Sequence, residues 1–149
     1  MDHEEMGKIF YSDQPIEPSK KYEVYGLMLG YFPDMEFTRY AKAVIKEVAN
    51  EFELDYLKLQ HIAKIKSKFN PFYFKILGAI NTFKDSENLI EWGIMGIKVA
   101  QARSVGFDTK LPTVLLEPEL CILYTCKYIS DFKLKNIGIN PYDSYIYPN

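Results

Sequence analysis

The chain has 149 residues, of which 48% are hydrophobic and 15% aromatic, and this is enough apolar material for the core of one domain. Its 18 basic and 20 acidic residues leave a net charge of -2, so no large basic field exists, and we exclude nucleic acid as a partner. The acidic N-terminus is unlike a secretory signal, and no stretch is apolar and long enough for a membrane anchor.

Two prolines among polar residues predict an irregular lead-in over residues 1–18, followed by a single domain over residues 19–149. Residues 20–31 favour a helix that Ser19 caps. A strand is the alternative for this segment, because valine and tyrosine favour extended structure and two glycines weaken a helix.

Two amphipathic helices are predicted next. Asp34 caps the first, in which the apolar residues recur at helical spacing and face inward: Phe37, Ala41, Val44, Val48 and Phe52. Asp55 caps the second, which runs over residues 56–69 with Leu59, Ile62 and Phe69 inward. Its lysines are expected to form a solvated face: Lys58, Lys64, Lys66 and Lys68.

Asn70 followed by Pro71 is typical of a helix start, so a helix is predicted over residues 71–83. Its expected buried stripe is Phe72, Ile76, Ile80 and Phe83.

Residues 85–104 predict a nearly all-round apolar helix through the middle of the domain, because the only charges in its centre lie seven residues apart on one stripe. Pro118 is expected to open the last long helix, over residues 118–135, and the tyrosine-rich tail to pack back as a short turn.

Little in the sequence indicates chemistry. The chain has two histidines, no glycine-rich phosphate loop and no clustered nucleophile and base, so we predict no catalytic residue, no metal and no cofactor. Cys121 and Cys126 lie five residues apart on one predicted helix, so their side chains diverge. They are expected to be buried free thiols, which suits a reducing, cytoplasmic location.

Two stretches carry a family pattern. The run AKAVIKEVANEFELDY, residues 41–56, resembles the death-motif helix of the Bcl-2 family of apoptosis regulators. The run INTFKDSENLIEWGIMGIKVA, residues 80–100, resembles the first homology motif of that family, at the entry to its buried central helix. The run DFKLKNIGINPYDSY stands where the second homology motif would be. The order of these motifs agrees with the helix order of the family.

The resemblance implies an all-α, Bcl-2-like helical bundle around a central hydrophobic helix, of the compact viral type. It also implies a surface groove for the death-motif helix of pro-apoptotic proteins of the Bim, Bak or Bax type. The protein would then inhibit cell death in the host cytoplasm and reach mitochondria only through its partners. The groove residues that the resemblance implies are Phe52, Tyr56, Leu59, Ala63, Ile80, Glu91, Trp92, Gly93, Ile94, Ile97 and Lys98.

One departure from the family bears on ligand binding. Ile94 stands where the family has an arginine that pairs with an aspartate of the bound helix, and Lys98, one helical turn further on, is expected to replace that cation. The alternative is a non-enzymatic helical interaction module, neutralising a toxin or inhibiting a signal, that does not bind death-motif helices. A Bcl-2-like fold with an unrelated partner, a homodimer held by the groove and an enzyme also remain open.

Overall fold

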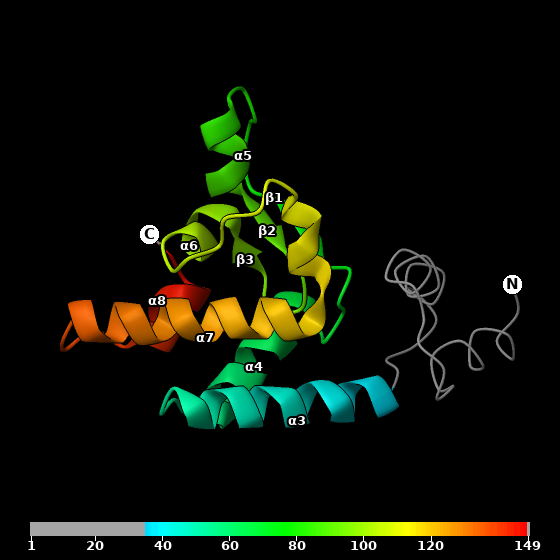
Figure 1. The fold of residues 1–149 in the computed structure, drawn as a ribbon, viewed down its shortest axis with the longest axis vertical. Helices are drawn as coiled ribbons and strands as arrows, with labels where there is room; N and C mark the ends of the chain where they lie inside the picture. The colour runs from blue at the N-terminus through cyan, green and yellow to red at the C-terminus, as the bar shows by residue number, and fades with distance from the viewer. Residues whose placement is uncertain (1–34, 149) are drawn as a thin grey trace, which may run out of the picture. The chain divides into compact units, whose positions relative to one another are not determined.

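Six α-helices and a three-stranded antiparallel sheet form residues 35–148, the part of the chain that the computed structural model describes (Figure 1). The prediction of an all-α bundle around a central hydrophobic helix is therefore wrong. All three strands come from the segments predicted as helices over residues 71–83 and 85–104. The predicted lead-in over residues 1–18 and the predicted helix over residues 20–31 lie outside the described residues.

The first two described helices, α3 (Met35–Glu51) and α4 (Tyr56–Ser67), match the prediction. Asp55 caps α4, since its side chain accepts hydrogen bonds from the first free backbone N–H groups of the helix. Helix α3 packs against α4 and against α7 (Pro118–Lys135), and it buries residues spaced by four. The buried residues are Phe37, Ala41, Ile45 and Ala49, whereas the sequence pattern predicted Val44, Val48 and Phe52 in the second half.

The segment after α4 forms a turn and a strand instead of the predicted helix. The side chain of Asn70 accepts a hydrogen bond from the backbone N–H of Phe72 at 2.8 Å, which closes a turn and does not open a helix. Strand β1 (Phe74–Ile76) follows, and the next helix, α5 (Phe83–Leu89), begins only after Thr82 caps it. Aromatic and β-branched residues favour the extended form here, and the packing of β1 against a second strand decides the outcome.

The predicted central helix over residues 85–104 is also wrong. The chain leaves α5, forms strand β2 (Ile90–Trp92), turns, and returns as strand β3 (Ile97–Lys98) before the short helix α6 (Val99–Arg103). The turn begins and ends at glycines with positive φ, +74° at Gly93 and +61° at Gly96. A Cβ atom at Gly93 would lie only 2.3 Å from a backbone oxygen, so no other residue fits there.

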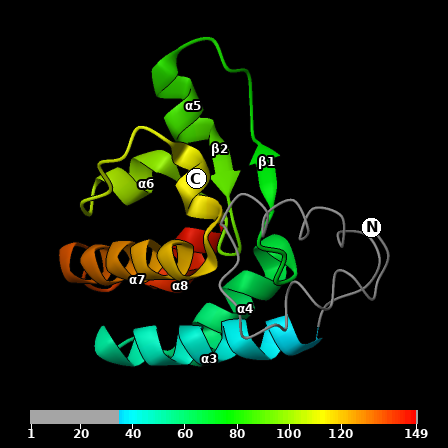
Figure 2. The same ribbon diagram turned by 45° about the vertical axis from the view of Figure 1, so that its right-hand side comes forward.

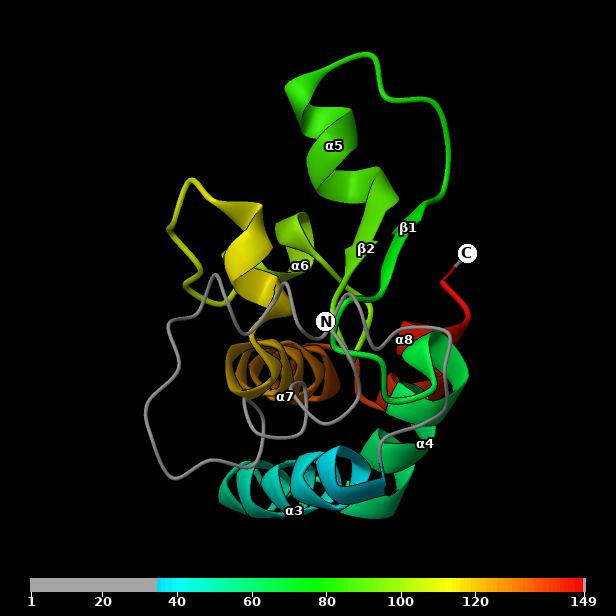
Figure 3. The ribbon, with the colours of Figure 1, turned by 90° about the vertical axis from the view of Figure 1, so that its right-hand side faces the viewer.

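The sheet has the order β1–β2–β3, and Figure 3 shows β1 and the antiparallel β2 side by side below α5. Phe74 is paired with Trp92 across the first ladder, and the two rings meet edge to face at 4.9 Å. Glu91 is paired with Lys75 on one side and with Lys98 on the other. Because side chains alternate along a strand, one face carries these charges and the opposite face is apolar.

The turn between β2 and β3 is buried, and three helices hold its backbone. Ser67 of α4 donates a hydrogen bond to the carbonyl of Ile94 at 2.6 Å. The N–H of Met95 points to the sulfur of Cys121 on α7, and Tyr145 of helix α8 (Pro141–Ile146) donates to the carbonyl of Met95 at 2.7 Å. The turn is thereby fixed at the centre of the described part of the chain.

The last long helix follows the sequence prediction, whereas the tail forms a short helix where a turn was predicted. Helix α7 begins at Pro118 and ends at Lys135, and the tail packs back through α8, which buries two of its tyrosines. Both cysteines are free and buried, as predicted. Figure 2 shows α7 and α8 between α3 and the sheet, while α5 lies at the end remote from α3. A short 3₁₀ helix, η1 (Pro112–Leu116), precedes α7.

Candidate interaction site at the edge of the sheet

The residues implied as a groove do not line a common groove. Leu59, Ala63, Ile94 and Ile97 have no exposed surface, so they belong to the core and no partner helix can contact them. Gly93 is buried in the turn between β2 and β3.

The remaining groove residues are scattered. Phe52 and Tyr56 flank the connection between α3 and α4 and are partly exposed, while Ile80 is exposed in the loop before α5. Lys98 lies on β3, opposite Glu91, and not one helical turn beyond residue 94. The helical geometry that the role of Lys98 as a substitute cation required is therefore absent. Trp92 faces a small pocket next to α5 and α6.

A buried ion pair joins α4 to β2. The ammonium nitrogen of Lys66 lies 2.7 Å from Oε2 of Glu91, and only 12% and 5% of these two side chains are exposed. The hydroxyl of Tyr73 donates to Oε1 of the same carboxylate at 2.9 Å. The expectation that Lys66 belongs to a solvated lysine face is therefore wrong for this residue.

The electrostatics of this cluster follow from its burial. Desolvation raises the pKa of the Tyr73 phenol far above its ordinary value, and the hydrogen bond to Glu91 and the charge of that carboxylate raise it further. Glu91 therefore holds one cation and one neutral donor, and it has no free oxygen with which to act on a substrate. We assign this cluster a structural role.

The outer edge of β1 is a free strand edge within the described part of the chain. Hydrogen bonds from Gly93 to Tyr73 and from Leu77 to Leu89 show which residues of the strand point toward β2. By the alternation of an antiparallel ladder, the backbone N–H and C=O groups of Phe74 and Ile76 point away from β2. These groups are available to another strand.

The apolar side chains around this edge are exposed as well. Every residue from Phe74 to Lys84 is exposed, and we call residues 74–84 the β1–α5 arm. Its large apolar side chains are exposed to between 39% and 76%: Phe74, Ile76, Leu77, Ile80 and Phe83. Figures 1 and 3 show that α5 and the loop leading into it lie remote from α3 within the described part of the chain. A set of exposed apolar side chains of this kind is typical of an interaction surface.

An open hollow of about 440 Å³ lies beside the start of β1. Lys66, Lys68 and Lys75 line it, together with aromatic and polar residues, and its lining contains no aspartate or glutamate. The charge of Lys66 is matched by Glu91, whereas Lys68 and Lys75 have no ion pair among the described residues. The hollow is therefore a basic surface next to the free strand edge.

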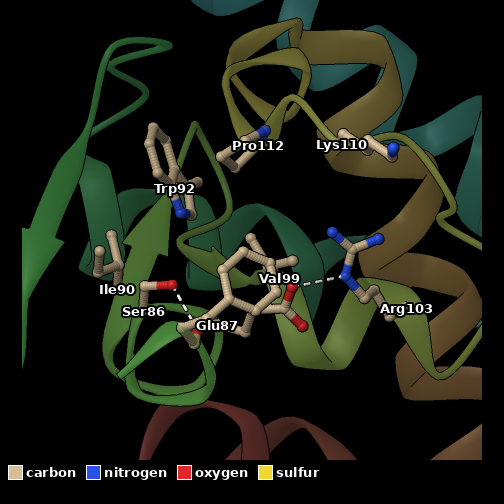
Figure 4. Close-up of a pocket in the computed structure, with 9 residues that line it drawn as sticks. Ser86, Glu87, Ile90, Trp92, Val99, Arg103, Lys110 and Pro112 are labelled. Atoms are coloured by element: carbon tan, nitrogen blue, oxygen red, sulfur yellow. Dashed lines mark hydrogen bonds and ion pairs between the residues drawn. The ribbon is translucent and has the colours of Figure 1, made fainter. Parts of the chain in front are cut away.

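A second, smaller pocket lies on the apolar face of the sheet, between α5, α6 and η1 (Figure 4). Arg103 donates from Nε to Glu87 at 2.8 Å on one wall, and the indole of Trp92 forms another. The buried Nε1 of Trp92 has no hydrogen-bond partner in the described structure. The cavity volume of about 50 Å³ is far below the ~300 Å³ of common small-molecule sites, so we assign it no ligand.

Groups that could carry chemistry are few in residues 35–148. No group of three or more histidine, cysteine, aspartate or glutamate side chains could hold a metal ion there. Burial raises the pKa values of Cys121 and Cys126 to about 12, so both thiols stay protonated at neutral pH and are poor nucleophiles. Neither thiol is therefore a candidate nucleophile.

Sequence reasoning missed the β1 edge. The signal that indicates it is the short alternation Phe74–Lys75–Ile76, between aromatic residues and Gly78. The proline after Asn70 outweighed this signal, because the pair is typical of a helix start. The burial of Lys66 has no sequence signal, since its partner lies 25 residues away on another element.

Comparisons with protein-family models, with curated proteins and with solved structures give no match. None of the helices in the described residues is of a length and hydropathy that could cross a bilayer.

Proposed function

We propose that this protein is a non-enzymatic interaction module, which binds an extended segment of a partner protein along the outer edge of β1. The observation that carries the proposal is that Phe74 and Ile76 combine outward-pointing backbone groups with exposed apolar side chains. Addition of a strand to a free sheet edge is an established mode of peptide recognition, in which backbone hydrogen bonds give affinity and alternate side chains give specificity.

The apolar side chains of the arm supply the second part of the interaction. A strand at the β1 edge would cover one side of Phe74 and Ile76, and residues beyond its end would reach Leu77 and Ile80. Burial of apolar surface contributes about 25 cal/mol per Å², from which the cost of ordering the partner must be subtracted. A micromolar dissociation constant, about −8 kcal/mol, is the expected order of affinity.

The anti-apoptotic function suggested by the resemblance to the Bcl-2 family remains an untested prediction. We do not favour it, because four of its groove residues are in the core and the central helix is replaced by a hairpin. We propose a cytoplasmic location, since two buried free thiols suit a reducing compartment.

Selection of peptides from a random phage-displayed library on the full chain tests the proposal. Peptides that bind should lose affinity for an Ile76→Pro variant, because proline removes the N–H that points to the partner. The ladder to β2 should survive, because it does not use that N–H. The matched control is Ile76→Thr, which keeps the N–H and a β-branched side chain and should retain most of the affinity.

Two results would contradict this function. One is a set of selected peptides that bind the Ile76→Pro protein as well as the native protein. The other is a set of peptides that bind as helices, with affinities that depend on Phe52 or Tyr56 and not on the arm. Either result would move the interaction surface away from β1.

A further inference from the structure

We infer that the segment bound at β1 is acidic, with carboxylates and apolar side chains in alternation. This inference rests on the proposed function and adds the chemistry of the partner. It follows from the face on which each residue of β1 lies and from the charges beside the strand.

The two faces of β1 differ in chemistry. Phe74 and Ile76 lie on the apolar face, and Lys75 lies between them on the opposite face. A strand added to the edge continues the same two faces. Its residues beside Phe74 and Ile76 therefore meet apolar surface, and the residue beside Lys75 meets a cation.

The hollow extends the basic surface beyond Lys75. Lys68 and Lys75 both line it, both are exposed, and neither has a carboxylate partner among the described residues. The nearest carboxylate across the ladder, Glu91, is held by Lys66 and Tyr73. An antiparallel partner would place its next residue on this face beside Tyr73, above the hollow, where a second carboxylate finds a cation. The sequence that fits is apolar–acidic–apolar–acidic.

The same lysine disfavours a second copy of this chain as the occupant. Two β1 strands paired antiparallel about their centre would place Lys75 of one copy directly opposite Lys75 of the other, and like charges in that position destabilise a sheet. A lysine on an edge strand is also a known device against self-association. An acidic strand turns the same lysine into an attractive contact.

Three synthetic peptides with blocked ends test the inference on the full chain: VEVEVE, VTVTVT and VKVKVK. Trp92 is the single tryptophan and contacts Phe74 edge to face, so its fluorescence reports binding at β1. The acidic peptide should bind at least about tenfold more tightly than the basic one, with the neutral peptide between them. Added salt should weaken the acidic peptide most.

Charge-reversed variants locate the effect. Lys75→Glu should reverse the preference between the acidic and the basic peptide, and Lys68→Glu should reduce it without touching the sheet. The matched control is Lys133→Glu, which makes the same charge change at an exposed position of α7 and should leave the preference unchanged.

The outcomes separate this inference from the function on which it rests. Equal binding of all three peptides, lost in Ile76→Pro, would overturn the acidic partner and leave the strand-binding function standing. No binding of any peptide would overturn both. Dimers of the native chain in sedimentation that disappear in Ile76→Pro would show that a second copy occupies the edge, and would overturn the inference.

Discussion

Replacement of Lys66 should destabilise the protein far more than replacement of an ordinary surface lysine. In Lys66→Met the Glu91 carboxylate stays buried with Tyr73 as its remaining donor. At 2.7 Å the gross attraction between the two charges is about 6 kcal/mol at an effective dielectric constant of ~20. The desolvation of both groups offsets most of this, so the pair itself contributes little, but removal of one partner leaves a buried charge that costs about 3 to 5 kcal/mol.

The opposite deletion should cost less. In Glu91→Gln the amide oxygen still accepts from Tyr73, and the long side chain of Lys66 can extend to the hollow that it lines. We expect a loss of about 1 to 2 kcal/mol. The double variant should be about as stable as Glu91→Gln alone, because it contains no unpaired charge. The coupling free energy of the cycle then equals the cost of Lys66→Met alone, about 3 to 5 kcal/mol.

Urea denaturation followed by the emission of Trp92 measures the four free energies of unfolding. Equal slopes against urea are the control that the variants unfold from the same fold. Additivity of the two single substitutions within ~0.5 kcal/mol would refute the reasoning, because it would mean that Lys66 and Glu91 do not interact in the folded protein.

Further predictions concern the turn, the thiols and α8. Gly93→Ala should lower the free energy of unfolding, measured by urea denaturation, by at least about 3 kcal/mol, because strain at positive φ adds to a clash with a backbone oxygen. The control is Gly138→Ala, at φ +91° with open space around it, which should cost only the strain, about 1 to 2 kcal/mol. The thiols of Cys121 and Cys126 have a pKa of about 12 in the folded protein and ~8.5 in the unfolded chain. As the pH rises, the unfolded chain therefore loses these protons first, and the free energy of unfolding should fall above pH ~8.5. The expected loss is about 2 kcal/mol per thiol at pH ~10. A thiol reagent should modify both in urea and neither in the native protein, and reaction in the native protein would contradict their burial. Tyr145→Phe removes the donor to a buried carbonyl and should cost about 1 to 3 kcal/mol by the same assay, so an unchanged midpoint would show that the bond does not contribute.

The parts of the fold that local signals determine were predictable. Asp55 caps α4 and Pro118 opens α7 because a side-chain acceptor and a missing N–H act within one turn of the chain. The burial of Cys121 and Cys126 agrees with the expectation that free cysteines lie in the core, although their side chains point to different faces of the helix.

The sheet was not predictable by the same means. Residues 89–100 carry only two charges, Glu91 and Lys98, and a largely apolar run of this kind fits a buried helix and a buried hairpin equally well. In the sequence, Gly93 and Gly96 do not decide between the two, since their spacing fits either close helix packing or the two ends of a turn. The hairpin is selected by the hydrogen bonds that the turn backbone makes with the side chains of Ser67, Cys121 and Tyr145, which come from other elements.

The candidate site depended on the same long-range choice. Whether Phe74 and Ile76 are buried on a helix or exposed on a strand is settled by the pairing of β1 with β2, which no local pattern reports. The resemblance to the Bcl-2 family assigned residues to a groove by their order along the chain, and it placed core residues such as Leu59 at the surface. No sequence pattern indicated that Lys68 and Lys75 lie on one basic surface.

The buried turn between β2 and β3 has a consequence for the order in which the protein folds during synthesis. The groups that satisfy its backbone come from before the turn and from after it, and the bond from Tyr145 to Met95 spans 50 residues. A nascent chain that has exposed the hairpin but not α8 still lacks the donor for the Met95 carbonyl. The hairpin should therefore remain unprotected against proteolysis and amide exchange until α8 has been translated.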